Sequence, residues 1–167
     1  MNTASDTDEH GDIDDAEAVY RAAAEAGDIA AMTQLAMLID ENAEYEEAEM
    51  WYRRATDAGD TTAMAGLAHM LRAAEDLDGA ESWWRRAAEP VPAEYYPGHI
   101  SAMYRLGVLL AGRGDLDEAE AWLERAAGRD NKPAMARLGE LLHDRGDFEA
   151  AETWRRRAAG NEYFWAQ

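Results

Sequence analysis

The sequence predicts an all-α fold, a right-handed α-solenoid of about four helix-turn-helix repeats with a leading capping helix. Three observations support this prediction. Two different segments recur at the same spacing, both place apolar residues with helical periodicity, and Gly-Asp pairs stand between the predicted helices. The length of 167 residues suits one short repeat array.

The two recurring segments define the repeat. One, typified by AEMWYRRA, begins at residues 16, 48, 80, 119 and 151, in steps of 32, 32, 39 and 32 residues. The other, typified by MTQLAMLI, begins at residues 32, 64, 103 and 135, in steps of 32, 39 and 32. Two segments that share one spacing indicate a helical hairpin repeated in tandem.

Each segment carries one apolar face. Apolar residues stand at offsets 0, 3, 4 and 7, as in Ala48, Trp51, Tyr52 and Ala55, which is the period of an α-helix. Small residues that follow a Leu in the second segment predict a close approach of the paired helices: Ala36, Ala68, Gly107 and Gly139. The tryptophans of the first segment are expected to fill the gaps between neighbouring pairs: Trp51, Trp83, Trp122 and Trp154.

The predicted turns use the residues that helix ends prefer. Gly27 and Gly59 suit the C-terminus of one helix, and Asp28 and Asp60 suit the N-cap of the next. On the outer faces, Glu and Arg four residues apart predict helix-stabilising ion pairs. These pairs are Glu17 and Arg21, Glu49 and Arg53, Glu81 and Arg85, and Glu152 and Arg156.

The repeat resembles a known family over about residues 16–160. It is similar to the tetratricopeptide repeat at Met103, Leu106, Gly107, Leu110, Ala119, Leu123 and Ala126. The junction between pairs resembles the Sel1-like subfamily, whose W-Y-x-x-A-x-x-x-G-x-x-x-A string appears as Trp51, Tyr52, Ala55, Gly59 and Ala63. The chain thus looks like a hybrid, although its 32-residue period is shorter than usual and the closing Pro is absent.

The resemblance implies that the first helix of each pair lines a concave groove that binds a partner. The residues expected there are Gln34, Met37, His69, Arg72, Tyr104, Arg105, Val108, Arg137, Glu140 and His143. Arg72, Arg105 and Arg137 predict a basic strip suited to a carboxylate or an acidic peptide. The alternative is that these arginines pair with neighbouring Glu or Asp in solvent.

Residues 89–101 interrupt the repeat and supply its one longer step. Three prolines are expected to keep this segment out of helix. Tyr95, Tyr96 and His99 make it a candidate contact surface. The alternative is a surface insertion that packs its own tyrosines.

Composition excludes several classes of function. The formal net charge of −19 argues against nucleic acid and anionic membranes as partners. The absence of Cys excludes a disulfide scaffold and a thiolate metal site, and no cofactor motif is present. A string at residues 6–17 resembles a calcium loop, but His10 stands where Asp or Asn is required, so an acidic disordered leader is favoured.

These observations predict three regions: a leader at 1–14, a repeat domain at 15–160 and an aromatic tail at 161–167. We expect a cytoplasmic, non-enzymatic adaptor that binds a peptide or partner segment in its groove. The partner is either a basic protein attracted by the overall charge or an acidic segment held by the arginine strip. Two further alternatives are self-assembly, through the aromatic tail or the tyrosine-bearing insertion, and regulation of an enzyme in trans.

Overall fold

The computed structural model describes residues 6–89 and 97–160, which form nine helices and no strand. This confirms the predicted all-α repeat fold. The helices are α1 (Asp6–Glu25), α2 (Ile29–Glu41), α3 (Tyr45–Asp57), α4 (Thr61–Ala73), α5 (Leu77–Ala88), α6 (Pro97–Arg113), α7 (Leu116–Ala127), α8 (Lys132–Asp144) and α9 (Phe148–Ala158).

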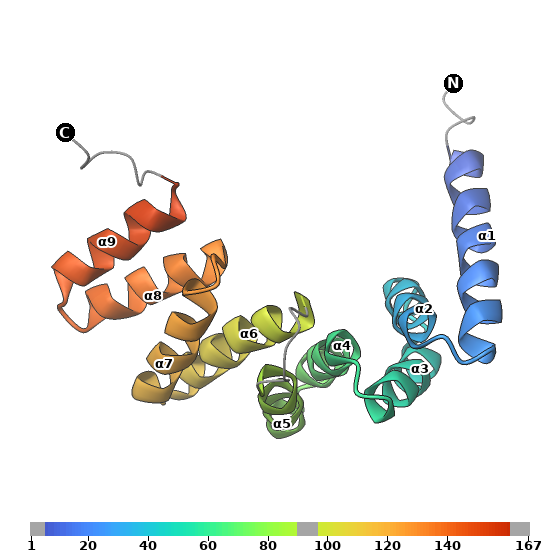
Figure 1. Ribbon diagram of the computed structural model, residues 1–167, viewed down its shortest axis with the longest axis horizontal. Helices are drawn as coiled ribbons and strands as arrows, with labels where there is room; N and C mark the ends of the chain where they lie inside the picture. The colour runs from blue at the N-terminus through green and yellow to red at the C-terminus, as the bar shows by residue number, and fades with distance from the viewer. Residues whose placement is uncertain (1–5, 90–96, 161–167) are drawn as a thin grey trace.

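The helices stack as successive hairpins along an arc (Figure 1). The closest packing is within the pairs α2–α3, α4–α5, α6–α7 and α8–α9, and α1 packs on α2 at one end. In Figure 1, α2, α4 and α6 lie on the inner side of the arc and α3, α5 and α7 on the outer side. The inner helices also contact one another, most extensively α4 with α6.

The predicted turn chemistry is confirmed. Gly27 and Gly59 adopt φ of 97° and 89°, a left-handed conformation that favours glycine. The side chains of Asp28 and Asp60 each accept a hydrogen bond from the backbone N–H three residues on, at 3.0 and 2.7 Å. These caps satisfy N–H groups that a helix start leaves without partners.

Small residues let paired helices approach closely, as predicted. A Cβ at Gly107 of α6 would lie 2.7 Å from Cγ of Leu123 in α7. A Cβ at Gly139 of α8 would lie 3.1 Å from the carbonyl oxygen of Ala151 in α9. The approach buries Leu123 and Ala151 completely.

The four repeated tryptophans differ from the expectation. Trp51 is buried, but Trp83, Trp122 and Trp154 are only half-buried at the edge of the core. In every repeat the Arg three residues on lies over the indole, because residues three apart share a helix face. The distances from Cζ to the ring are 4.5 Å for Arg54, 5.1 Å for Arg86, 4.2 Å for Arg125 and 5.3 Å for Arg157.

The structure also differs at two segment boundaries. Helix α1 begins at Asp6, so the backbone of residues 6–14 is helical where a disordered leader was expected; no Pro interrupts this stretch, and acidic residues are favourable near a helix N-terminus. Helix α6 begins at Pro97, so residues 97–101 are helical where a loop was expected, because Pro is tolerated in a first turn.

Of the residues predicted as contact surfaces in the insertion and the tail, the structure describes only His99. Tyr95 and Tyr96 of the insertion, and the aromatic tail at 161–167, lie outside the described residues. His99 is half-buried in α6, and its Nδ1 lies 3.0 Å from the carbonyl oxygen of Ala87. Among the helices of the described ranges, none is long and apolar enough to cross a membrane.

Candidate functional site

All ten predicted groove residues lie on the first helices of their pairs. Gln34 and Met37 are on α2, His69 and Arg72 on α4, Tyr104, Arg105 and Val108 on α6, and Arg137, Glu140 and His143 on α8. The structure brings only part of this set together.

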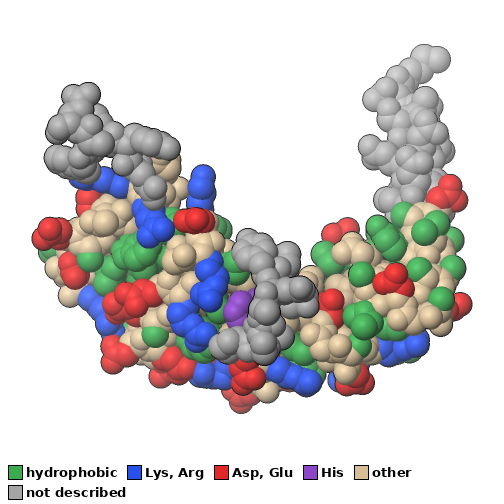
Figure 2. Space-filling model, viewed as in Figure 1, with side chains coloured by type: hydrophobic (Ala, Val, Ile, Leu, Met, Phe, Trp, Pro, Cys, Tyr) green, Lys and Arg blue, Asp and Glu red, His purple; other side chains and the backbone are tan. Residues whose placement is uncertain are grey.

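Two adjoining cavities lie along α4 and α6. The first, of about 480 Å³, includes Met37, His69, Trp84 and Arg105 in its lining. The second, of about 430 Å³, includes Arg72, Val108 and again Trp84 and Arg105. We call these two cavities the central groove. Figure 2 shows Lys or Arg side chains and a His near the middle of the face in view.

The length and start of α6 create this groove. Helix α6 has 17 residues, whereas α2, α4 and α8 have 13 each. Its extra first turn crosses the start of α4 at Gly98, where a Cβ would lie 2.6 Å from the backbone nitrogen of Thr62. The close crossing places Arg105 beside α4.

The second cavity of the groove is basic although the chain is acidic, whereas Asp40 and Glu41 join Arg105 in lining the first. Neither Arg72 nor Arg105 forms an ion pair with any described residue, and Arg105 lies 5.8 Å from the ring of Tyr104. The pKa of His69 is held below its usual value first by burial and then by the charges of Arg72 and Arg105, against the opposing charge of Asp40. The positive charges of Arg72 and Arg105 therefore both reach the part of the groove beside His69.

Trp84 adds a hydrogen-bond donor that sequence reasoning assigned only to the core. The side chain is 1% exposed and lines both cavities of the central groove. Its Nε1 has no hydrogen-bond partner among the described residues. The Nε1 atom is itself buried, so an oxygen atom of a ligand reaches it only if neighbouring side chains move. An unpaired buried donor costs about 1–3 kcal/mol, which such a contact would remove. The only sequence signal was the polar end of the indole itself.

The three residues on α8 form a separate group. Arg137 lies outside the two cavities and pairs with Glu140, Nη1 to Oε2 at 2.7 Å. His143 packs edge-on against Phe148 with ring centroids 5.1 Å apart. The pairing of Arg137 with Glu140 is what the alternative of arginines paired in solvent predicts. Helices α6 and α8 also pack less extensively than α4 and α6, so Arg137 lies apart from Arg72 and Arg105. Gln34 is exposed on α2 and also lies outside the central groove.

The outer face is held by ion pairs. The four predicted Glu–Arg pairs are confirmed, with N–O distances of 2.6–2.9 Å. Sequence reasoning missed that Arg21 also binds Glu47 and that Arg85 also binds Glu118, each in the next pair of helices. Since these residues satisfy one another, the outer face has a structural explanation.

The same two acids accept a hydrogen bond from an indole. Trp51 donates to Glu47 and Trp122 to Glu118, each at 3.2 Å. The arginine partner, and then the indole, hold the pKa of each carboxyl below its usual value. The equivalent positions of the other two repeats hold Gly79 and Ala150, so this tie occurs at alternate junctions. That alternation was readable in the sequence.

In the part of the chain that the structure describes, no three His, Asp or Glu side chains are grouped to hold a metal ion. The central groove instead gathers two arginines, a tryptophan and several apolar side chains.

Comparison with known proteins identifies the class. Two sequence models described as tetratricopeptide repeat match residues 60–132 and 133–157. A search of curated protein sequences gave no match. The fold and these matches define a helical repeat solenoid. More particularly, the chain belongs to the tetratricopeptide repeat proteins.

Solved structures agree. The chain is similar to pilF of Pseudomonas aeruginosa, with a TM-score of 0.76 and 17% identity over 93% of this chain and 72% of that one. It is also similar to c5321, a protective antigen of uropathogenic Escherichia coli with an SLR fold. The TM-score is 0.73 and the identity 26%, over 86% of this chain and 32% of that one. For a Sel1 repeat protein from Oxalobacter formigenes the TM-score is 0.70 and the identity 24%, over 86% of this chain and 62% of that one. Repeats of this family generally serve as protein-interaction modules.

Proposed function

We propose that this chain is a non-enzymatic adaptor that binds an extended segment of another protein in the central groove. The family supports a protein partner. The observation that carries the location is that Trp84 and Arg105 line both adjoining cavities and Arg72 lines the second, while neither arginine has an ion-pair partner among the described residues.

These side chains favour a segment that carries a carboxylate. A guanidinium binds a carboxylate through two parallel hydrogen bonds, and the indole N–H suits a carbonyl or carboxylate oxygen. The net charge of −19 opposes an acidic partner at long range. That field is screened beyond about 10 Å at 0.1 M salt, so the nearby arginines dominate once the segment is in the groove. This reasoning favours an acidic side chain or a C-terminal carboxylate over a wholly basic partner.

A random peptide library displayed on phage tests the proposal against the full chain. Enriched peptides are then measured against the Arg72→Gln/Arg105→Gln variant. Loss of the arginine–carboxylate contacts is expected to weaken binding by about tenfold or more.

The matched control is Arg155→Gln/Arg156→Gln, which makes the same change in charge on α9, where both residues are exposed. Binding to this control should be unchanged. Equal affinity of the peptides for the wild type and the groove variant would contradict the proposed site, and a library that yields no binder would contradict groove binding altogether.

A further inference from the structure

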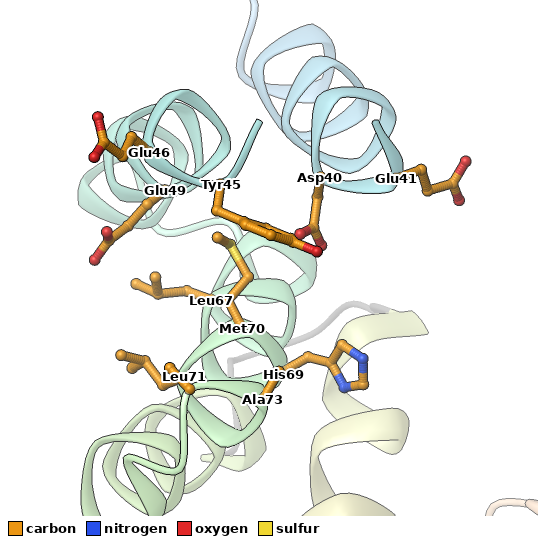
Figure 3. A pocket seen from close by; sticks show the side chains of 11 residues that line it. Asp40, Glu41, Tyr45, Glu46, Glu49, Leu67, His69, Met70, Leu71 and Ala73 are labelled. Carbon is orange, nitrogen blue, oxygen red and sulfur yellow. The ribbon is translucent and has the colours of Figure 1, made fainter. Parts of the chain in front are cut away.

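A third cavity adjoins the central groove. It has a volume of about 560 Å³ and lies where the turn between α2 and α3 meets the C-terminal half of α4 (Figure 3). We call it the Tyr45 pocket and define it by Asp40, Glu41, Tyr45, Glu49, Met70 and Leu71. Asp40, Glu41 and His69 line both this pocket and the first cavity of the central groove, so the two form one continuous surface.

The wall of the pocket is apolar. In Figure 3 the ring of Tyr45 lies above Leu67 and Met70. Tyr45 is 60% exposed, and Met70 and Leu71 are half-buried. Such a wall suits the aliphatic stem of a long side chain.

The charged groups of the pocket are acidic. In Figure 3 Asp40 points toward the hydroxyl end of Tyr45, while Glu41, Glu46 and Glu49 point outward at the rim. Glu49 is neutralised by Arg53, with an N–O distance of 2.6 Å. Asp40 is half-buried and forms no ion pair with a described Lys or Arg. Burial raises the pKa of Asp40 despite the nearby His69, so this carboxylate lacks a compensating charge.

We propose that the Tyr45 pocket takes one Lys or Arg side chain of the segment bound in the central groove, with the stem on Tyr45 and Met70 and the cation at Asp40. None of the described residues that line the pocket is Lys or Arg, so a ligand cation supplies a complementary charge. This inference rests on the proposed function. It adds that the bound segment carries a cation at one end and a carboxylate at the other, which fixes its direction along the groove.

The peptides enriched from the phage-displayed library provide the probe. We expect them to carry a Lys or Arg on one side of their acidic residue. Replacing that Lys or Arg by Met keeps the stem and removes the charge. The change should weaken binding to the wild type by roughly tenfold.

A variant of the pocket isolates the contact. Against Asp40→Asn/Glu41→Gln, the peptide with Lys or Arg and the peptide with Met should bind equally. Against Glu25→Gln/Glu124→Gln, which removes two charges from exposed positions elsewhere, the tenfold difference should persist. Loss of the difference only in the pocket variant would locate the cation at Asp40.

The outcomes separate the two proposals. If binding depends on Arg72 and Arg105 but the Met peptide binds as tightly as its parent, the pocket takes an apolar anchor or nothing, and only the present inference fails. If the difference persists in the pocket variant, the cation binds elsewhere and the inference also fails. If no peptide depends on Arg72 and Arg105, the proposed function itself fails.

Discussion

Gly107 has no side chain, which lets Leu123 of α7 pack closely against α6. The buried Nε1 of Trp84 has no hydrogen-bond partner among the described residues, which costs stability. The periodicity predicted the first of these features, because a small residue recurs at that place in each repeat. The resemblance to the tetratricopeptide repeat, rather than the periodicity, predicted that His69, Arg72 and Arg105 face one groove. The periodicity could not predict the unpaired indole of Trp84, because it ranks Trp as apolar and says nothing of hydrogen-bond partners in other helices.

The close contact at Gly107 predicts a loss of stability on adding one methyl group. Gly107→Ala gains up to about 1 kcal/mol of helix propensity but forces Leu123 to move, which typically costs about 1–3 kcal/mol. We therefore expect a net loss in the free energy of unfolding, measured by urea denaturation. Gly112→Ala is the control in the same helix, because nothing lies within 4 Å of its Cβ. A stabilised Gly107→Ala variant would refute the close contact.

The burial of Asp40 predicts a pH-dependent stability. Because the folded pKa is raised above the unfolded value, the contribution of Asp40 is fully present below the unfolded pKa and is lost as pH rises through the folded pKa. Asp40→Asn is therefore expected to increase the free energy of unfolding at pH 7. The increase should fade in acid, where Asp40 is protonated in both states. Urea denaturation across pH measures it, and a destabilised variant at pH 7 would contradict the argument.

The helices themselves were largely predictable, whereas the contacts between pairs were not. Glycine and aspartate at the turns, and apolar residues at 3.6-residue spacing, are local signals that mark helix bounds. The start of α6 at Pro97 was missed because Pro is compatible with either a first turn or a loop. The tie from Arg85 to Glu118 spans 33 residues, and only packed helices reveal that these side chains meet.

Removing either the Arg21–Glu47 or the Arg85–Glu118 tie, two of several ion pairs that join neighbouring helix pairs, should lower stability by similar amounts. Glu47→Gln and Glu118→Gln each weaken an ion pair and an indole hydrogen bond, for an expected loss of about 1 kcal/mol each at pH 7. Because the folded pKa of each carboxyl is lowered, its contribution is present above the unfolded pKa and is lost as pH falls through the folded pKa. Urea denaturation at several pH values measures the free energy of unfolding of each variant. Glu124→Gln, at an exposed position, is the control. An equal loss of stability in the control would show that the ties to Arg21 and Arg85 contribute nothing particular.

The missing tie at the last junction can be installed. Glu124 occupies the position equivalent to Arg85, and Ala150 the position equivalent to Glu118. We expect Glu124→Arg/Ala150→Glu to be more stable than the sum of the two single changes predicts, by roughly 0.5–1 kcal/mol. Additive single effects in a double-mutant cycle would show that the geometry of this junction differs from that of the tied ones.

Across the whole molecule, the described buried apolar residues form two clusters that meet at α4. One runs from Ala24 to Leu67 and the other from Met64 to Ala151. The sequence repeats so regularly that it predicts one continuous core. The division coincides with the junction where Gly79 replaces the tying glutamate, which only the packed array makes evident.

The two clusters predict stepwise opening. In repeat arrays, stability is a sum over repeats and their interfaces, so the weakest interface opens first. Native-state hydrogen exchange is expected to show the amides of α2 and α3 exchanging together, at a lower opening free energy than those of α6 to α8. One common free energy for all slow amides would contradict two units.

The division at α4 also makes the candidate binding surface sensitive to mechanical tension. The first cavity of the central groove takes residues from α2 and α3 on one side and from α5 and α6 on the other. We expect a pull on the two ends of the array to widen this groove, because its walls belong to the two different clusters. Conversely, a bound segment that contacts both walls joins the two clusters, and its binding energy opposes extension of the array.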